Sequence, residues 1–146
     1  MMRVITVTNG PRQRPDAIDS AVIPIFMERI QKNLALTVFG DGEQTRDFVH
    51  VSDVVAHCLF FMKTIQDKSA VFNVCSGTAI SINDLIALLK DLSAQSIKVD
   101  YAPRRAGDIV NALGDPSKAK AAGISSQISL EAGLAELYKN QSQSKD

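Results

Sequence analysis

The stretch that decides the fold is residues 36–51, which read Leu36-Thr37-Val38-Phe39-Gly40-Asp41-Gly42-Glu43-Gln44-Thr45-Arg46-Asp47-Phe48-Val49-His50-Val51. The run from Leu36 to Phe39 predicts a short strand, and the two glycines that follow predict a tight turn. Phe39 and Arg46 stand on either side of that turn. An aromatic ring can pack against a nucleobase, and a guanidinium can bind a phosphate. The stretch therefore predicts a place where a nucleotide can bind.

Strand and helix patterns alternate along the chain, which predicts a mixed α/β fold in two layers or in a three-layer-like arrangement. Short β-branched and aromatic runs predict strands at Val4–Thr8, Leu36–Phe39, Arg46–Val51, Ala70–Val74 and Ile97–Tyr101. Apolar residues at helical spacing predict about five helices. These helices are expected to begin at Asp19 or Ser20, at Ser52 or Asp53, at Ser81, after Asp115-Pro116 and at Ser129.

Local signals define the helices more closely. The first helix should end near Lys32-Asn33, Gly123 should end the fourth, and the last should run through Tyr138. Ser81 and Asp84 have the spacing of a capping box. The second helix is expected to turn one apolar face towards the core, made of Val54, Val55, Cys58, Leu59 and Met62.

The length and composition predict one domain, and its net charge is close to zero. The chain has 146 residues, 45 % of them hydrophobic, which predicts one domain over residues 1–139 and a disordered polar tail over residues 140–146. Sixteen basic and sixteen acidic residues balance, so a general nucleic-acid binder is not expected. No apolar run is long enough to cross a membrane and no secretory signal is visible, so we expect a cytoplasmic protein.

A second basic loop, Arg104-Arg105-Ala106-Gly107-Asp108, completes the candidate site. Arg46 and Arg105 could together hold a diphosphate, while Phe39 and the backbone at Thr37 could meet a base and Asp108 the ribose hydroxyls. A simpler interpretation stays open for each residue. Phe39 could belong to the core, Arg46 could pair with Asp47 or Asp53 on the surface, and Asp108 could cap a turn.

The histidines and cysteines give no separate site. His50 and His57 lack a further ligand at metal spacing, so we expect them to be packed or hydrogen-bonded, and we predict no metal. Cys58 and Cys75 both lie in apolar surroundings, which favours buried thiols of a reducing compartment over a disulfide.

Taken in order, these motifs resemble the carboxy-terminal half of the extended short-chain dehydrogenase/reductase family of nucleotide-sugar epimerases and dehydratases, of the UDP-glucose 4-epimerase type. The resemblance covers nearly the whole chain. It rests on Gly10-Pro11-Arg12-Gln13, Ala21-Val22-Ile23-Pro24, Phe39-Gly40-Asp41-Gly42, Thr45-Arg46-Asp47-Phe48-Val49-His50-Val51 with Asp53, Phe72-Asn73-Val74, Arg104-Arg105-Ala106-Gly107-Asp108 and Asp115-Pro116-Ser117-Lys118-Ala119.

The resemblance implies roles that coincide with those argued from chemistry. It implies that Arg46 and Arg105 hold the nucleotide diphosphate of a UDP-sugar, that Phe39 and Thr37 line the base, and that Asp108 meets the ribose. Asn9 resembles the family's substrate-binding asparagine, although it directly precedes Gly10 here, where the family has two further residues. Val7 is the alternative position for that asparagine.

The chain also departs from the family. Members use NAD, which they hold on a glycine-rich turn in an amino-terminal half, and they carry a catalytic tyrosine and lysine spaced four apart. Neither feature occurs here, so we expect no catalytic residue and no cofactor bound by this chain alone. The first and fourth predicted strands would normally join a larger sheet, so we expect a homo-oligomer or a separate amino-terminal half as partner.

Three functions follow from these expectations. The first is the nucleotide-sugar-binding portion of an epimerase or dehydratase, inactive alone. The second is an interaction or structural protein with a vestigial ligand site. The third is one chain of a two-chain enzyme.

Overall fold

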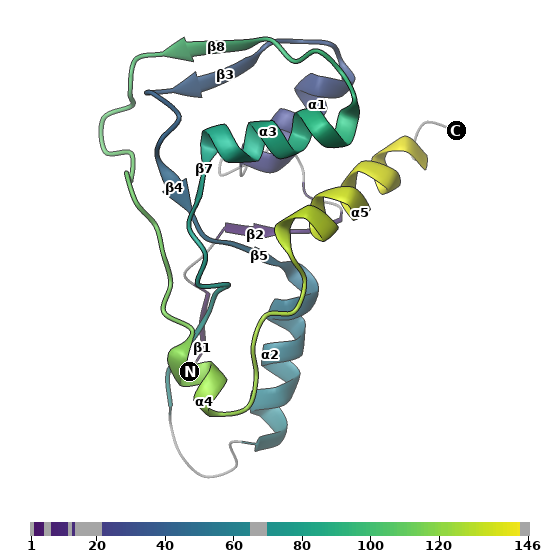
Figure 1. Ribbon diagram of the computed structural model, residues 1–146. Helices are drawn as coiled ribbons and strands as arrows, with labels where there is room; N and C mark the ends of the chain where they lie inside the picture. Colours follow the sequence, from purple (N-terminus) through teal and green to yellow (C-terminus); the bar gives the residue numbers. More distant parts are fainter. Residues whose placement is uncertain (1, 5–6, 12, 14–21, 65–69, 144–146) are drawn as a thin grey trace.

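The computed structural model describes residues 2–4, 7–11, 13, 22–64 and 70–143. Over these residues the chain forms the mixed α/β fold that the sequence predicts, with five helices and eight short strands (Figure 1). The helices are α1 (Val22–Gln31), α2 (Val51–Thr64), α3 (Ile82–Ser93), α4 (Ser117–Ala121) and α5 (Leu130–Gln143). The strands are β1 (Met2–Val4), β2 (Val7–Asn9), β3 (Leu36–Phe39), β4 (Thr45–Arg46), β5 (Phe48–His50), β6 (Phe72–Val74), β7 (Ile80–Ser81) and β8 (Val99–Ala102).

The strands associate in pairs. Three pairs are parallel, β1 with β6, β2 with β5 and β3 with β8, and β4 pairs antiparallel with β7. The first predicted strand, Val4–Thr8, is in fact two strands with different partners, separated by residues 5–6, which lie outside the described part. Met2 is opposite Phe72, whereas Val7 is opposite Phe48. The β-branched composition of this run was sufficient to predict extended backbone but carried no information about the change of partner.

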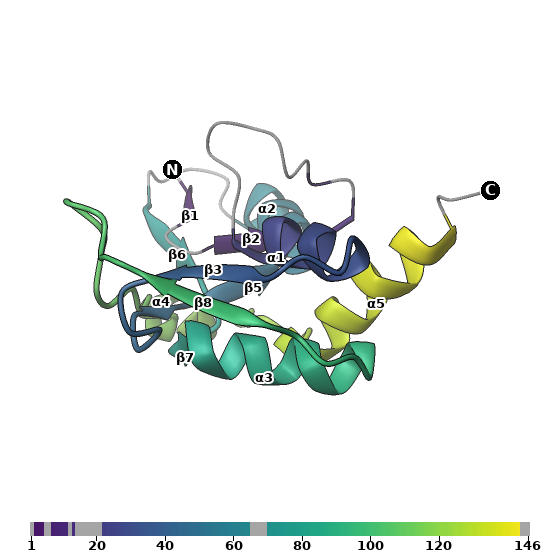
Figure 2. The same cartoon turned by 90° about the horizontal axis from the view of Figure 1, so that it is seen from above.

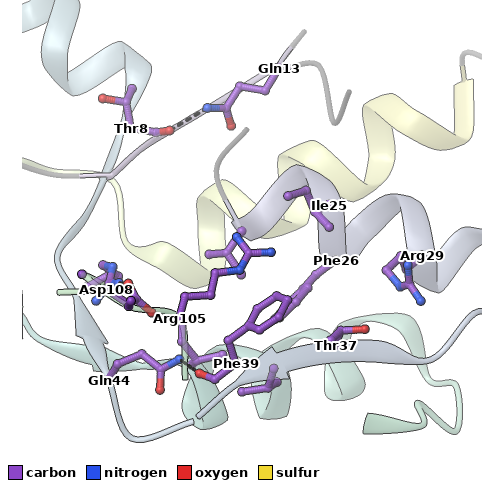
Figure 3. Close-up of a pocket in the computed structure, with 16 residues that line it drawn as sticks. Thr8, Gln13, Ile25, Phe26, Arg29, Thr37, Phe39, Gln44, Arg105 and Asp108 are labelled. Carbon is purple, nitrogen blue, oxygen red and sulfur yellow. Dashed lines mark hydrogen bonds and ion pairs between the residues drawn. The ribbon is translucent and has the colours of Figure 1, made fainter. Parts of the chain in front are cut away.

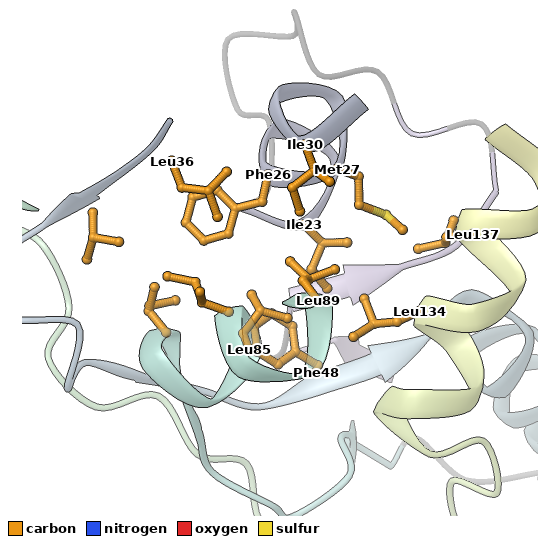
Figure 4. Packing of buried hydrophobic residues seen from close by; sticks show 13 residues of the cluster. Ile23, Phe26, Met27, Ile30, Leu36, Phe48, Leu85, Leu89, Leu134 and Leu137 are labelled. Carbon is orange, nitrogen blue, oxygen red and sulfur yellow. The ribbon is translucent and has the colours of Figure 1, made fainter. Parts of the chain in front are cut away.

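The main hydrophobic core lies among α1, α3, α5 and the strands β3 and β5 (Figure 4). Its members are buried aliphatic and aromatic side chains, among them Ile23, Phe26, Met27, Leu36, Phe48, Leu85, Leu89 and Leu134. Figure 2 shows β3 and β8 lying between α1 on one side and α3 on the other. A smaller cluster joins Phe61 of α2 with Phe72 of β6 and Ala119 of α4.

Several predicted boundaries are confirmed. The start predicted for the first helix lies outside the described residues, but its end is confirmed, since Asn33 has a left-handed φ of 52° and the Leu34 amide donates to Arg29 O at 2.8 Å. Ser81 and Asp84 form the predicted capping box of α3. Gly123 follows the short helix α4 with a φ of 99°, a conformation that favours glycine.

The inner face predicted for the second helix is wrong at three of its five residues. The residues of α2 that point inward are Asp53, His57 and Phe61, whereas Val55, Leu59 and Met62 are 50 %, 52 % and 78 % exposed. The described strands that α2 packs on, β2 and β5, contact its polar side. Val55, Leu59 and Met62 lie on the more exposed side of the helix, while Val54 and Cys58 are partly buried.

The expected cap of α2 is also wrong. The helix begins at Val51, and it is the Nδ1 atom of His50 that accepts from the Ser52 amide, at 3.3 Å. Asp53 instead reaches the loop before α5, where its two oxygens accept from the amides of Gln127 and Ile128 at 3.0 Å each. A carboxylate that ties together residues far apart in sequence has no local signature.

The predicted extended segment Arg46–Val51 is interrupted. Asp47 separates β4 from β5, is 1 % exposed, and accepts hydrogen bonds from the Ser76 amide and hydroxyl and from the amides of Gly77 and Gly114. The last helix continues to Gln143, beyond the predicted end at Tyr138 and into the segment expected to be a tail.

Candidate functional site

A cleft of about 920 Å³ opens between α1, β3 and the loop that follows β8 (Figure 3). Polar and apolar side chains share its wall. The lining residues include Gln13, Ile25, Phe26, Arg29, Thr37, Phe39, Gln44, Arg46, Arg105 and Asp108. Five of the six residues predicted from the sequence as site residues are therefore brought together in one cleft.

The floor of the cleft is β3, whose side chains alternate between two faces. Leu36 and Val38 are buried in the core, and Thr37 and Phe39 lie on the opposite face and line the cleft. Pairing with β8 places the end of β3 beside Ala102, directly before the basic loop. The sheet register thus brings residues 37–39 next to residues 105–108.

Arg105 lies over the ring of Phe39. Its guanidinium carbon is 3.7 Å from the ring centroid, which is a cation–π contact. Phe39 is half-buried in the wall of the cleft, so the simpler interpretation of this residue as core is not what the structure shows. The contact holds a positive charge and an apolar surface at one point of the cleft wall.

Arg46 is held in place by three acceptors. Its Nη1 atom donates to the carbonyls of Thr45 and Ile109 at 2.8 and 2.7 Å, and its Nη2 atom forms an ion pair with Asp108 Oδ1 at 2.8 Å. The alternative that Arg46 pairs with Asp47 or Asp53 is therefore wrong. This ion pair joins β4 to the basic loop, and it brings the first predicted arginine into the same cleft as Arg105.

Asn9 occupies a different position from the other predicted residues. It lies in β2 opposite His50, is 2 % exposed, and is not among the residues that line the cleft. Its Oδ1 atom is buried without a hydrogen-bond partner in the described part of the structure. A Cβ atom on Gly133 of α5 would come within 3.5 Å of that oxygen, so α5 packs closely over it.

Two residues of the cleft have no counterpart in the sequence prediction. Gln44 donates through Nε2 to Phe39 O at 2.8 Å and so fixes the end of β3. Arg29 donates through Nε to Ala35 O at 2.5 Å. Arg29 follows Val22 and Ile25 at helical spacing, and all three line the cleft. The spacing places Arg29 on the same helix face as Val22 and Ile25. Apolar periodicity does not mark it, because Arg29 is charged.

The glycine turn after β3 does not fit a dinucleotide pyrophosphate. It is followed by β4 and not by a helix, and a Cβ atom on Gly42 would clash with the side chain of Asn83. The Asn83 side chain donates to Asp41 O and to Glu43 Oε1, and its amide donates to Gly42 O. The start of α3 therefore covers the turn. On that side, the backbone amides of residues 40–42 are not open to a phosphate.

Neither histidine lies in the cleft. His57 is buried with its Nδ1 atom 2.7 Å from Asp53 O, and His50 Nε2 is 3.5 Å from a carboxylate oxygen of Glu136. Within the described residues, no group of three or more histidine, cysteine, aspartate or glutamate side chains is placed to bind a metal ion. Cys58 and Cys75 are not joined in a disulfide; Cys75 is buried and Cys58 partly buried. In the same part of the chain, no helix combines the length and the apolar composition needed to cross a bilayer.

The chain is similar to known epimerases over most of its length. Residues 2–75, more than half of the chain, match the NAD dependent epimerase/dehydratase family. A putative UDP-glucose 4-epimerase of Methanocaldococcus jannaschii is 33 % identical over 125 residues, which cover 86 % of this chain and 40 % of that protein.

Two solved structures have the same fold. UDP-glucose 4-epimerase of Thermotoga maritima with UDP-glucose matches with a TM-score of 0.90 and 33 % identity, over 99 % of this chain and 46 % of that one. UDP-glucuronic acid 4-epimerase of Bacillus cereus in complex with UDP-glucuronic acid and NAD matches with a TM-score of 0.87 and 29 % identity, over 97 % and 44 %. The chain spans less than half of the length of these relatives. With more than half of its residues matched by the family, the chain belongs to the NAD-dependent epimerase/dehydratase family.

Proposed function

We propose that this chain is the carboxy-terminal, nucleotide-sugar-binding half of an NAD-dependent epimerase or dehydratase, and that the cleft binds a UDP-sugar. Arg46 and Arg105 hold the diphosphate, Phe39 and the backbone at Thr37 line the base, and Asp108 contacts the ribose while it orients Arg46. Asn9, expected from the sequence as a further substrate contact, is buried beneath α5 outside the cleft, so we assign it no contact with the ligand in this arrangement. We also propose a cytoplasmic location, because the apolar sequence surroundings of Cys58 and Cys75 favour a reducing compartment.

One observation supports this proposal above the others. Arg46 and Arg105 come from segments far apart in the sequence and line the same cleft, beside the Phe39 ring. Two guanidinium groups provide paired N–H donors that match phosphate oxygens. The three bonds that hold Arg46 also mean that little side-chain freedom is lost when an anion binds. The UDP-sugars named with the related epimerase structures have this chemistry.

Calorimetric titration with UDP and UDP-glucose tests the proposal. We expect binding by the unaltered protein and a loss of about 10- to 100-fold in affinity with Arg105→Ala, since a hydrogen bond to a charged group contributes about 1.5–3 kcal/mol. Arg104→Ala is the matched control, because Arg104 neighbours Arg105 but is exposed and pairs loosely with Asp41 at 3.6 Å. Equal affinity in all three proteins, or no binding at all, would exclude the cleft as a diphosphate site.

Arg46 needs a different variant, because its ion pair with Asp108 also holds the basic loop. Arg46→Lys keeps the positive charge and loses the paired donors. We expect weaker UDP binding with little change in the thermal midpoint, whereas Arg46→Ala should lower both. A midpoint lowered equally by the two variants would assign Arg46 to loop structure alone.

Chemistry on the sugar requires NAD held by another part of the enzyme. The glycine turn in the described part of this chain does not fit that cofactor, so we propose that the isolated chain has no epimerase activity and that a dinucleotide-binding half supplies the cofactor. That half is either part of the same polypeptide or a separate chain. Activity of this chain alone with added NAD and UDP-glucose would contradict the proposal.

The exposed stripe of α2 is where we propose that this half packs. Val51, Val55, Leu59 and Met62 follow one another at helical spacing, and all are exposed. The strand β6, whose Phe72 stacks on Phe61 of the buried side of α2, pairs only with β1 among the described strands, and Val71 before it is 43 % exposed. An exposed apolar stripe and an open strand edge are each typical of surfaces that another layer covers.

The same stripe favours the second candidate function, an interaction protein that associates through α2, with a second copy as the simplest partner. Light scattering at micromolar concentration, with and without Leu59→Asp, separates the candidates. A dimer that becomes a monomer in Leu59→Asp supports self-association through the stripe. A monomer in both cases leaves the dinucleotide-binding half as the partner, which co-purification of the two halves then tests directly.

A further inference from the structure

Arg29 is a charged side chain held rigidly at the edge of the cleft. It lies on the face of α1 that carries Val22 and Ile25, four residues after Ile25, and all three line the cleft. Its Nε atom donates to Ala35 O at 2.5 Å, in the turn that leads into β3. The neighbouring acidic residue of the helix, Glu28, is paired with Lys32 at 2.6 Å. The main-chain bond fixes the position of the guanidinium plane relative to β3.

The position of Arg29 is distinct from that of the two predicted arginines. Figure 3 shows Arg29 with Thr37 towards one end of the view and Arg105 with Asp108 towards the other, with Phe39 between them. Thr37 and Phe39 are two residues apart on the same strand face, which corresponds to about 7 Å along β3. That separation is about the width of one base ring system. A base that lies beside the Phe39 ring and over Thr37, with its diphosphate at Arg105, would therefore direct its far edge towards Arg29.

The chemistry of a guanidinium restricts what that edge can be. Arginine has five N–H donors and no acceptor, so it can bind a carbonyl oxygen of a base but not an exocyclic amino group. The preference resembles the pairing of arginine with the carbonyl-bearing edge of guanine in nucleic-acid recognition. A base that places an amino group there would leave two donors facing each other in a partly buried site, which costs affinity.

We propose that Arg29 is a specificity-determining residue that selects bases with a carbonyl at the far edge, such as uracil, against their amino counterparts, such as cytosine. This inference rests on the proposed function, since it requires a nucleoside diphosphate in the cleft. Arg29 would discriminate between bases. Arg46 and Arg105 cannot do so, because their contacts with the diphosphate are the same for every base.

Competitive titration with UDP and CDP tests the role of Arg29, since these ligands differ only in the carbonyl or amino group at one ring position and in the proton on the adjacent ring nitrogen. We expect the unaltered protein to bind UDP roughly 10- to 100-fold more tightly than CDP, on the scale of a hydrogen bond to a charged donor. Arg29→Met keeps much of the length of the side chain and removes its donors, so UDP affinity should fall and CDP affinity should not. Arg29→Lys, which retains a donor, should restore part of the preference.

The controls distinguish this inference from the proposed function. Arg105→Ala should weaken UDP and CDP by the same factor and leave their ratio unchanged. Thermal midpoints of the Arg29 variants report any loss of the bond to Ala35. Equal affinity for UDP and CDP in the unaltered protein, or an Arg29→Met variant that keeps the preference, overturns the role of Arg29 alone. Failure of every nucleoside diphosphate to bind overturns both proposals.

Discussion

The cleft side of the molecule and the α2 side both carry apolar helical stripes in the sequence, but the fold buries them differently. On the cleft side, β3 and α3 place their apolar residues in the main core, and Leu85 is fully buried. On the α2 side, the helix buries Asp53 and His57 and exposes Leu59. An apolar helical stripe thus predicts that a helix face will be buried. It does not predict whether the same chain or a partner buries it.

Two leucines on the two helices give the largest expected contrast. Leu85→Ala removes a fully buried side chain from the main core and should cost about 2–5 kcal/mol of unfolding free energy. Leu59→Ala, at 52 % exposed, should change it by about 0.5 kcal/mol or less. Urea denaturation of both variants measures the difference. Similar losses at the two positions would mean that the α2 stripe is covered in solution.

The buried carboxylate between the two regions should have the next largest effect. Asp47 accepts four hydrogen bonds from Ser76, Gly77 and Gly114, so Asp47→Asn turns an amide donor towards other donors. We expect a loss of about 3 kcal/mol, the scale of hydrogen bonds to a charged group. Asp91→Asn, at an exposed position of α3, is the matched control. A tolerated Asp47→Asn would indicate that the loops around Asp47 do not depend on its charge.

The two helix starts provide a smaller test. Ser81→Ala removes the hydroxyl that accepts from the Asp84 amide at 3.0 Å and should cost about 1 kcal/mol. Ser52→Ala removes an exposed hydroxyl inside the first turn of α2, where His50 accepts the amide hydrogen bond, and should cost about 0.5 kcal/mol or less. Thermal denaturation of the pair is sufficient. If Ser52→Ala cost as much stability as Ser81→Ala, the result would support the prediction that Ser52 caps α2.

The last effect is absent at neutral pH and appears only in alkaline solution. Burial, with a contribution from the Asp47 carboxylate, raises the pKa of the Cys75 thiol from 9.0 to about 11. The folded state therefore keeps its proton where the unfolded chain loses it, and this contribution to stability is complete below pH 9 and is lost as the pH rises to about 11. Cys75→Ala should flatten the decline of stability between these two pH values, and Cys58→Ala should not. An unchanged slope in Cys75→Ala would contradict the shift.

Much of the cleft side was predictable because its signals are local. The strand Leu36–Phe39, the glycine turn and the capping box at Ser81 each depend on residues within a few positions of one another. The basic loop was also visible as a candidate partner of Arg46. Arg29 was not predicted because it is a charged residue among the apolar ones of its helix face, and only the packing of α1 beside β3 places it in the cleft.

The rest depended on contacts between distant residues. The run Val4–Thr8 was recognisable as extended, but only pairing with Phe72 and Phe48 divides it into two strands. The segment from Asn140 onward was expected to be a tail because it lacks apolar residues, whereas α5 continues to Gln143.

By itself, the sequence determined the alternation of strands and helices, the turn between Phe39 and Arg46, and the residue types of a nucleotide site. Only the tertiary structure decided that Arg46 pairs with Asp108, 62 residues away, that Asp53 and not Leu59 faces inward, and that Arg29 enters the cleft. The physical reason is that turns and caps are satisfied by hydrogen bonds between near neighbours. A buried charge or a cleft wall is satisfied only by groups that the whole fold brings together.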